Sequence, residues 1–279
     1  MAGRADLMSS SSLSRIVFGL VVPSAGSGLG ERVDELARWM GERLGARIHR
    51  REAASYEALA NDVRDGLVDV AWLPPIVFVR LAEVVTPIGS ILRGGASAYE
   101  AALIVRASSE IDTIDALRGT RAGWVDLWSA AGFVLPRVKL AMLGVDPRTL
   151  FRTETFHGSH RSAIKALVEG ACDVTGTYAR ANESGEITTG GWSEIAGADV
   201  RVIATFGAIP PDVLAVRSAL ADRIRDKAFA AIRDACADEK TRALVRDVFG
   251  GDDLTEGIAS GYDDLLKALD TATSRGIFD

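Results

Sequence analysis

The sequence predicts an α/β protein made of two similar lobes, joined by two strands, with a ligand cleft between the lobes. Short apolar segments rich in β-branched residues alternate with amphipathic helical segments, and this order favours parallel strands, which need crossover connections. The order occurs twice along the chain. Gly19 and Gly66 in the first copy are separated by the same distance as Gly123 and Gly170 in the second. We therefore expect each copy to form one lobe.

Each copy reads as strands alternating with helices. Helices are indicated by apolar residues that recur every three or four positions, followed by a glycine where the pattern ends. In the first copy we expect strands over 16–22, from 47 and over 68–73, with helices ending at Gly45 and Gly66. In the second copy we expect strands over 121–125 and 172–176, with helices ending at Gly144 and Gly170.

One isolated strand-like segment follows the third strand of each copy, and both segments end in Val-Arg. They are Tyr99–Arg106 and Asp212–Arg217. A hinged protein needs two such segments, one to reach the second lobe and one to return. We expect lobe 1 to comprise 14–98 and 211–279, completed by helices near 220–237, 239–249 and 262–275, and lobe 2 to comprise 99–210. Ligands of open α/β sheets lie at the carboxyl ends of the strands, so the cleft is expected there.

Composition excludes several classes of protein. The chain has 279 residues, of which 48% are hydrophobic and 25% charged, as in ordinary globular proteins. A net charge of −6 and the absence of any Lys/Arg-rich run argue against nucleic acid as the partner. No apolar run reaches the ~18 residues of a transmembrane helix. Residues 1–14 contain no stretch of signal-peptide type. We expect a monomer that is periplasmic or extracellular if a signal was removed, and cytoplasmic if the chain is complete as given.

The motifs of common cofactors and catalytic centres are not found. Cys172 and Cys236 lie in apolar segments without Cys/His spacing, which favours two buried free thiols over a zinc site. His157 and His160 lack an evident third ligand, so no metal is expected. The glycine-rich stretch 26–30 is neither a phosphate-binding loop nor a complete dinucleotide motif, and its expected role is to let the backbone approach the cleft. We expect no cofactor and no catalysis.

An ordered set of motifs along the chain resembles one family. The set spans about Ile16 to Phe249 and includes Tyr99-x6-Arg106, Thr113–Gly119, Val125-Asp126-x-x-Ser129-x-x-Gly132-Phe133-x-x-Pro136, Leu143–Asp146, Gly158-Ser-His160, Ala163–Gly170-x-x-Asp173 and Ile209–Asp212. Together these motifs look like the phosphate, phosphite and phosphonate substrate-binding proteins of ABC transporters. The resemblance implies the fold of type 2 periplasmic binding proteins, and an ABC permease as the partner to which the ligand is delivered.

The resemblance also implies an anion site. In that family a Ser-Thr-Ser-Gly loop at the start of a helix holds the ligand's oxyanion, and the loop falls on Ser129, Ala130, Ala131 and Gly132. The helix N-terminus still offers free N–H groups and the positive end of its dipole. Two of the three hydroxyls are absent, and each lost hydrogen bond to a charged group is worth ~1.5–3 kcal/mol. With the apolar surface of Trp128 beside the loop, we expect a ligand that is less charged or bulkier than phosphonate.

The resemblance also implies pocket positions at Tyr56, Tyr99, His160 and Asp212, and each of them has two interpretations. Tyr56 and Tyr99 could donate to an oxyanion or stack on an organic group, or else belong to the core. His160 could donate to an anion, or be solvated beside a helix capped by Ser159. Asp212 could bind a cationic group or simply shape a turn. Trp72 ends the third strand, where either burial or ligand contact is expected.

Three functions fit the predicted fold, since a fold does not by itself fix an activity. The leading hypothesis is a non-catalytic solute-binding protein that closes on a small oxyanion or organophosphonate-like ligand. The second is a cytosolic enzyme on the same architecture, as in menaquinone or pyrimidine-moiety biosynthesis. The third is a ligand sensor. An enzyme needs a defined acid or base in the cleft, whereas a transport protein binds its ligand reversibly.

Overall fold

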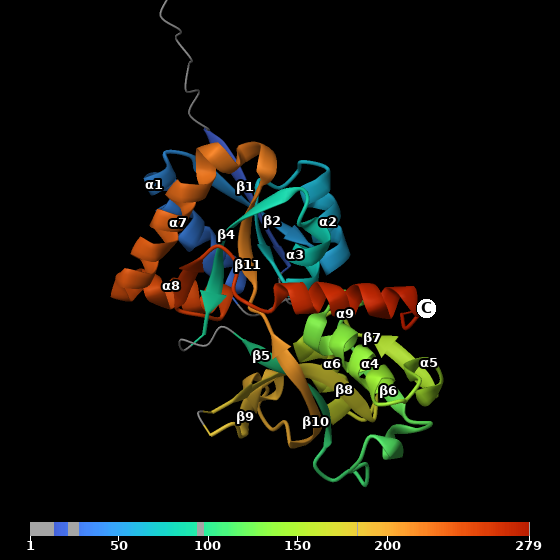
Figure 1. The fold of residues 1–279 in the computed structure, drawn as a ribbon. Coiled ribbons are helices and arrows are strands. Elements are labelled where there is room, and N and C mark those ends of the chain that lie inside the picture. The colour runs from blue at the N-terminus through green and yellow to red at the C-terminus, as the bar shows by residue number, and fades with distance from the viewer. Residues whose placement is uncertain (1–13, 22–27, 94–97, 183, 279) are drawn as a thin grey trace, which may run out of the picture.

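The computed structural model describes residues 14–21, 28–93, 98–182 and 184–278 (Figure 1). Residues 26 and 27 of the glycine-rich stretch and residues 1–13 lie outside these ranges. The first part of the chain forms β1 (Arg15–Val21), α1 (Leu29–Leu44), β2 (Arg47–Ala53), α2 (Tyr56–Arg64), β3 (Val70–Leu73), α3 (Pro75–Leu81) and β4 (Val85–Leu92). The last part forms β11 (Val213–Arg217), α7 (Ala221–Ala237), α8 (Glu239–Phe249), β12 (Asp253–Glu256) and α9 (Tyr262–Ser274).

The middle of the chain forms the second lobe, which lies below the first in Figure 1. Its elements are β5 (Tyr99–Arg106), β6 (Arg121–Trp124), a π-helical turn (Ala130–Val134), α4 (Leu135–Met142), α5 (Pro147–Leu150), β7 (Thr153–Phe156), α6 (His160–Val168), β8 (Val174–Ala181), β9 (Ile187–Gly190) and β10 (Val200–Ile209). Short 3-10 turns at 115–117, 191–194 and 218–220 complete the described chain.

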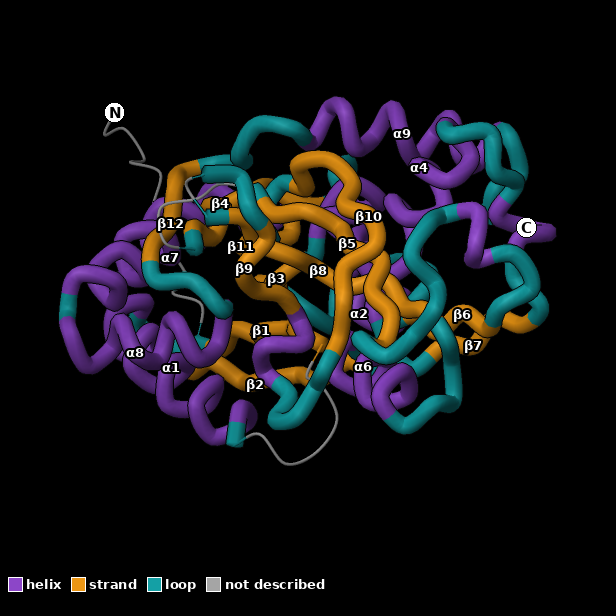
Figure 2. The backbone as a smooth tube through the Cα atoms, turned by 90° about the horizontal axis from the view of Figure 1, so that it is seen from below, coloured by secondary structure: helices purple, strands orange, loops and turns teal. Residues whose placement is uncertain are grey.

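Each lobe contains a mixed sheet of six strands. The first sheet has the order β12-β4-β11-β3-β1-β2, and the second has the order β10-β5-β8-β6-β7, with β9 paired to β8. The predicted strand-helix-strand repeats are confirmed, because β1 is parallel to β2 and β3, and β6 is parallel to β7 and β8. The helices α1, α7 and α8 pack together on one face of the first sheet (Figure 2), and α2 and α3 pack on its opposite face.

The repeat extends to individual hydrogen bonds. In the first lobe the N–H of Val17 donates to the Asp69 carboxylate at 2.9 Å, and the N–H of Asp69 donates back to the Val17 carbonyl at 2.9 Å. In the second lobe Arg121 and Asp173 make the same two bonds at 2.9 and 2.8 Å. The residues that precede these aspartates explain the paired glycines: a Cβ on Gly19 would lie 2.7 Å from the Val68 methyl groups, and one on Gly123 would lie 2.6 Å from Cys172 Sγ.

The two strands that end in Val-Arg occupy equivalent places in the two sheets. β11 lies antiparallel to β3 in the first sheet, and β5 lies antiparallel to β8 in the second. The arginine that ends each strand lies beside the aspartate of the hydrogen-bonded pair in its own lobe: Arg217 Nη2 lies 3.0 Å from Asp69 and Arg106 Nη2 lies 3.6 Å from Asp173. Each sheet is therefore completed by a strand that follows a crossing between the lobes, as a hinged protein requires.

The C-terminal helix, which the sequence assigns to lobe 1, contacts both lobes. α9 packs against α3 of the first lobe and α4 of the second, and Figure 1 shows it lying across both. Beyond its end, the carbonyl of Ile277 accepts a hydrogen bond from Arg137 Nε at 3.0 Å, and the Phe278 ring lies 6.0 Å from that of Phe133. The assignment of this helix to lobe 1 (14–98 and 211–279) therefore stays a prediction.

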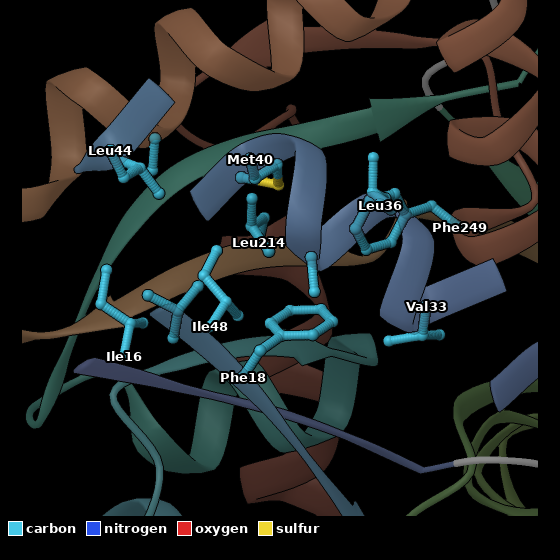
Figure 3. Close-up of a pocket in the computed structure, with 12 residues that line it drawn as sticks. Ile16, Phe18, Val33, Leu36, Met40, Leu44, Ile48, Leu214 and Phe249 are labelled. Carbon is cyan, nitrogen blue, oxygen red and sulfur yellow. The ribbon is translucent and has the colours of Figure 1, made fainter. Parts of the chain in front are cut away.

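The interior of the first lobe contains a small apolar cavity of about 20 Å³ between α1 and the sheet (Figure 3). A buried water needs polar partners, and only apolar side chains surround this space. It is a gap in the core rather than a ligand site. The two cysteines are buried and free, and burial raises the pKa of both thiols to about 11. Within the described ranges, no helix has the length and apolar character to cross a membrane.

Candidate functional site

A cleft of about 680 Å³ is lined by both lobes. This volume lies in the range of ~300–1,000 Å³ that is typical of small-molecule sites. The first lobe contributes residues of α2, β3 and α8, and the second contributes the π turn, α6 and β8. The predicted site residues that line the cleft are Tyr56, Trp72, Tyr99, Ser129, Ala130, Ala131, His160 and Asp212.

The π turn brings unpaired backbone N–H groups to the cleft wall. The Ser129 hydroxyl accepts the N–H of Gly132 at 3.1 Å, and the Ser129 carbonyl accepts that of Val134 at 2.9 Å. No described residue accepts the N–H of Ala130 or Ala131. Since the turn continues directly into α4, these donors stand at the positive end of a helix, where an anion is favoured. Turns of this wide type are rare and recur at functional sites.

A second helix begins at the same cleft. Ser159 caps α6 by accepting the N–H of Ser162 at 3.1 Å, and His160 follows as the first helical residue. His160 Nδ1 lies 3.0 Å from the Thr177 hydroxyl, and its ring meets Tyr178 edge-on at 5.1 Å. Burial lowers the pKa of His160 to about 4. The imidazole is therefore neutral at neutral pH, with one nitrogen committed to Thr177 and the other left for a ligand.

This histidine makes stability depend on pH. The unfolded chain takes up a proton near pH 6.5, whereas folded His160 does so only near pH 4, so stability falls as the pH drops through that window. His157, whose pKa is also lowered by burial, acts in the same direction. We expect the free energy of unfolding of His160→Gln, measured with urea, to change less between pH 7 and pH 4 than that of the wild-type protein. The exposed His49→Gln is the control, and equal curves for the two variants would contradict this assignment.

The two candidate tyrosines are protonated hydrogen-bond donors. Burial, reinforced by the Asp212 carboxylate, raises the pKa of both Tyr56 and Tyr99 above the ordinary value. Asp212 itself is paired with Arg93, whose Nη2 lies 2.5 Å from Oδ2. Arg93 also donates to the Phe249 carbonyl at 3.1 Å. The negative charge of Asp212 is thus already balanced by Arg93, which lies where the chain passes from the first lobe to the second.

The two tryptophans have different surroundings. Trp72 lines the cleft with its ring edge-on to Phe249 at 5.2 Å. Trp128 does not line it: the guanidinium of Arg80, from α3 in the other lobe, lies 4.2 Å from its ring centroid. Next to it, Asp126 accepts the N–H of Trp128 at 2.8 Å and also the N–H of Tyr56 at the start of α2. Trp128 and Asp126 therefore hold the two lobes together.

Several lining residues were missed by sequence reasoning. Arg93 follows β4 directly, at the crossing into the second lobe. Tyr178 and Arg180 share one face of β8, which continues to Ala181, beyond the segment 172–176 expected from the sequence. Extending the alternation of that strand would have found them. The remaining charged residues of the lining are Arg32, Arg161, Lys165, Glu194 and Asp247. Among the described residues, no three His, Cys, Asp or Glu side chains gather as a metal site.

Comparison with known proteins agrees with this geometry. Residues 20–262 match the family model described as "ABC transporter, phosphonate, periplasmic substrate-binding protein". A curated relative, the phosphate-import protein PhnD of Mycolicibacterium smegmatis, is 27% identical over 154 residues, which are 50% of this chain and 48% of that protein. The match thus spans about half the length of that relative.

Solved structures with the same fold include two phosphonate-binding proteins. PhnD1 of Prochlorococcus marinus, in complex with methylphosphonate, superposes with a TM-score of 0.77 at 14% identity, covering 93% of this chain and 98% of that one. The binding protein PA3383 of a Pseudomonas aeruginosa ABC phosphonate transporter gives 0.74 at 19% identity, covering 94% and 96%. These matches confirm the predicted type 2 periplasmic-binding-protein fold. The chain belongs to the family of phosphonate ABC transporter substrate-binding proteins, a non-catalytic family of solute-binding proteins.

Proposed function

We propose that the protein binds a phosphorus oxyanion bearing an organic group and delivers it to an ABC permease. The observation that carries this proposal is the meeting of two helix N-termini, at the π turn and at α6, in one cleft between the lobes. Free N–H groups of Ala130 and Ala131, the Ser129 hydroxyl and His160 supply donors to a tetrahedral anion without a fixed cation.

The rest of the cleft suits an organic substituent. Tyr56, Tyr99 and Trp72 offer aromatic surface, and the two phenols are donors at neutral pH. The volume of about 680 Å³ exceeds what a bare phosphate needs, which favours the bulkier ligand over a small inorganic anion. The family is non-catalytic, which argues against the biosynthetic-enzyme alternative.

Binding is coupled to closure of the lobes. A ligand held by Ser129 and His160 in the second lobe and by Tyr56 and Trp72 in the first stabilises the conformation in which both touch it. Asp126 and Trp128 add contacts to the first lobe that do not involve the ligand. A closed complex then presents one defined surface to a permease, whereas a sensor would present it to a signalling protein.

A thermal-shift screen tests the proposal. A ligand at about 100 times its Kd stabilises by ~2.7 kcal/mol, or roughly 5–10 °C for a chain of this size. We expect methylphosphonate, aminoethylphosphonate, phosphite or phosphate to raise the midpoint, and Ser129→Ala and Tyr99→Phe to reduce the shift without unfolding the protein. Ser274→Ala, on the exposed end of α9, is the control. A shift with neutral metabolites alone, or a full shift in Ser129→Ala, would refute the oxyanion site.

A further inference from the structure

We infer that the ligand carries a second anionic group, a carboxylate or a second phosphoryl group, and that Arg180 binds it. The inference rests on the proposed function and adds the class of ligand. Arg180 lies on β8 and lines the cleft. Its guanidinium stacks on the Tyr178 ring at 5.0 Å. No described carboxylate forms an ion pair with it.

The side chain of Arg180 has one buried donor that no described residue pairs with. Its Nε is buried and has no hydrogen-bond acceptor among the described residues. A buried donor without an acceptor costs ~1–3 kcal/mol, and more when the group is charged. Arg32 and Arg93, on the same cleft, are paired with Asp247 and Asp212. Because Arg180 lacks such a carboxylate, an anionic group of the ligand is the partner that completes its surroundings.

Two further donors support this assignment. Trp72 Nε1 and Arg93 Nε are also buried without an acceptor in the described structure, and both residues line the same cleft from the first lobe. An anionic group between these donors and Arg180 would be held by both lobes. The lining as a whole has five basic side chains against three acidic ones, within a protein whose net charge is −6. The cleft is thus a local site for negative charge.

The position of Arg180 sets the length of the ligand. Gly176, on the same strand, packs against the π turn, since a Cβ there would lie 3.0 Å from the Ala131 carbonyl oxygen. Four residues of extended strand place the Cα of Arg180 about 13 Å further along. An arginine side chain reaches back over roughly half of that distance. The second anion therefore stands a few bonds from the phosphorus, as in a phosphonocarboxylate, and Arg180 distinguishes such ligands from aminophosphonates.

Calorimetric titrations of methylphosphonate, 3-phosphonopropionate and 2-aminoethylphosphonate test the inference. The last two ligands have similar length and opposite charge at the far end. We expect wild-type protein to bind 3-phosphonopropionate at least about tenfold more tightly than either of the others. Arg180→Gln should weaken the binding of 3-phosphonopropionate by about 10- to 100-fold and the binding of methylphosphonate by less than about threefold. Arg38→Gln, at an exposed position of α1 outside the cleft lining, should change neither.

The other outcomes separate a failure of the second anionic subsite from a failure of the proposed function. Equal affinity of wild-type protein for methylphosphonate and 3-phosphonopropionate, or an equal loss of both in Arg180→Gln, overturns the second anionic subsite while the oxyanion site stands. No binding of any of the three overturns the proposed function as well. Arg180→Lys keeps the charge and should retain a preference for 3-phosphonopropionate. If Arg180→Gln does not fold, the charge-reversed Arg180→Glu decides, since it should favour 2-aminoethylphosphonate.

Discussion

Replacement of Gly132 with alanine should abolish phosphonate binding and lower the unfolding temperature by several degrees. A Cβ at this position would lie 2.3 Å from Val125 Cγ2 and 2.5 Å from Val125 Cβ, well inside van der Waals contact. The turn cannot yield in the other direction, because Gly176 of β8 packs against Ala131 and Gly132. Overpacking of this kind costs ~1–3 kcal/mol, and about 2–4 °C accompanies each kcal/mol in a chain of this size.

Binding is lost for the same reason. Gly132 makes two hydrogen bonds in this turn: its N–H donates to Ser129 Oγ, and its carbonyl accepts the N–H of Val125 at 3.3 Å. The clash displaces this segment and breaks both bonds. The oxyanion donors of Ala130 and Ala131 move with it. Gly30→Ala is the matched control, since its Cβ would meet only the guanidinium end of Arg50, which can move aside. Calorimetry and thermal unfolding of both variants decide the matter. A Gly132→Ala protein that binds normally would show that the turn does not form the site.

Restoring the two missing hydroxyls should tighten binding of methylphosphonate. Ala130→Thr combined with Ala131→Ser places hydroxyl groups where the cleft now has methyl groups. A hydrogen bond to a charged group contributes ~1.5–3 kcal/mol, so the affinity of the double variant should rise by at least about tenfold. The measurement is the Kd by calorimetry. Ala116→Ser, at an exposed position far from the lining, gives the effect of a hydroxyl elsewhere. An unchanged or weaker affinity would mean that the oxyanion does not contact these side chains.

Much of the architecture is predictable from local pattern. Apolar periodicity and glycine punctuation define the two strand-helix-strand copies, and the paired Gly19 and Gly123 have the same physical role of admitting a neighbouring side chain. Trp72 was predicted because it ends a strand at the carboxyl edge of a parallel sheet, where cleft residues gather. Ser129 and His160 were predicted from the resemblance to the family, and all three residues line the cleft.

The residues that the sequence did not reveal depend on contacts between distant segments. Trp128 looked like a ligand contact, but its partner Arg80 belongs to the other lobe. Arg93 becomes a cleft residue only because the crossing brings Asp212 beside it. α9 lies across both lobes because Arg137 and Phe133 hold the chain that follows it. No periodicity within a single segment contains this information.

The most direct test of the account is a crystal structure of the protein with methylphosphonate. We expect one ligand between the lobes, with phosphonate oxygens within about 3 Å of Ser129 Oγ and of the backbone nitrogens of Ala130 or Ala131. His160 should be close enough to share the same group. A phosphonate bound only away from the π turn, or a cleft that stays empty at saturating ligand, would contradict the central claim that this turn is the anion site.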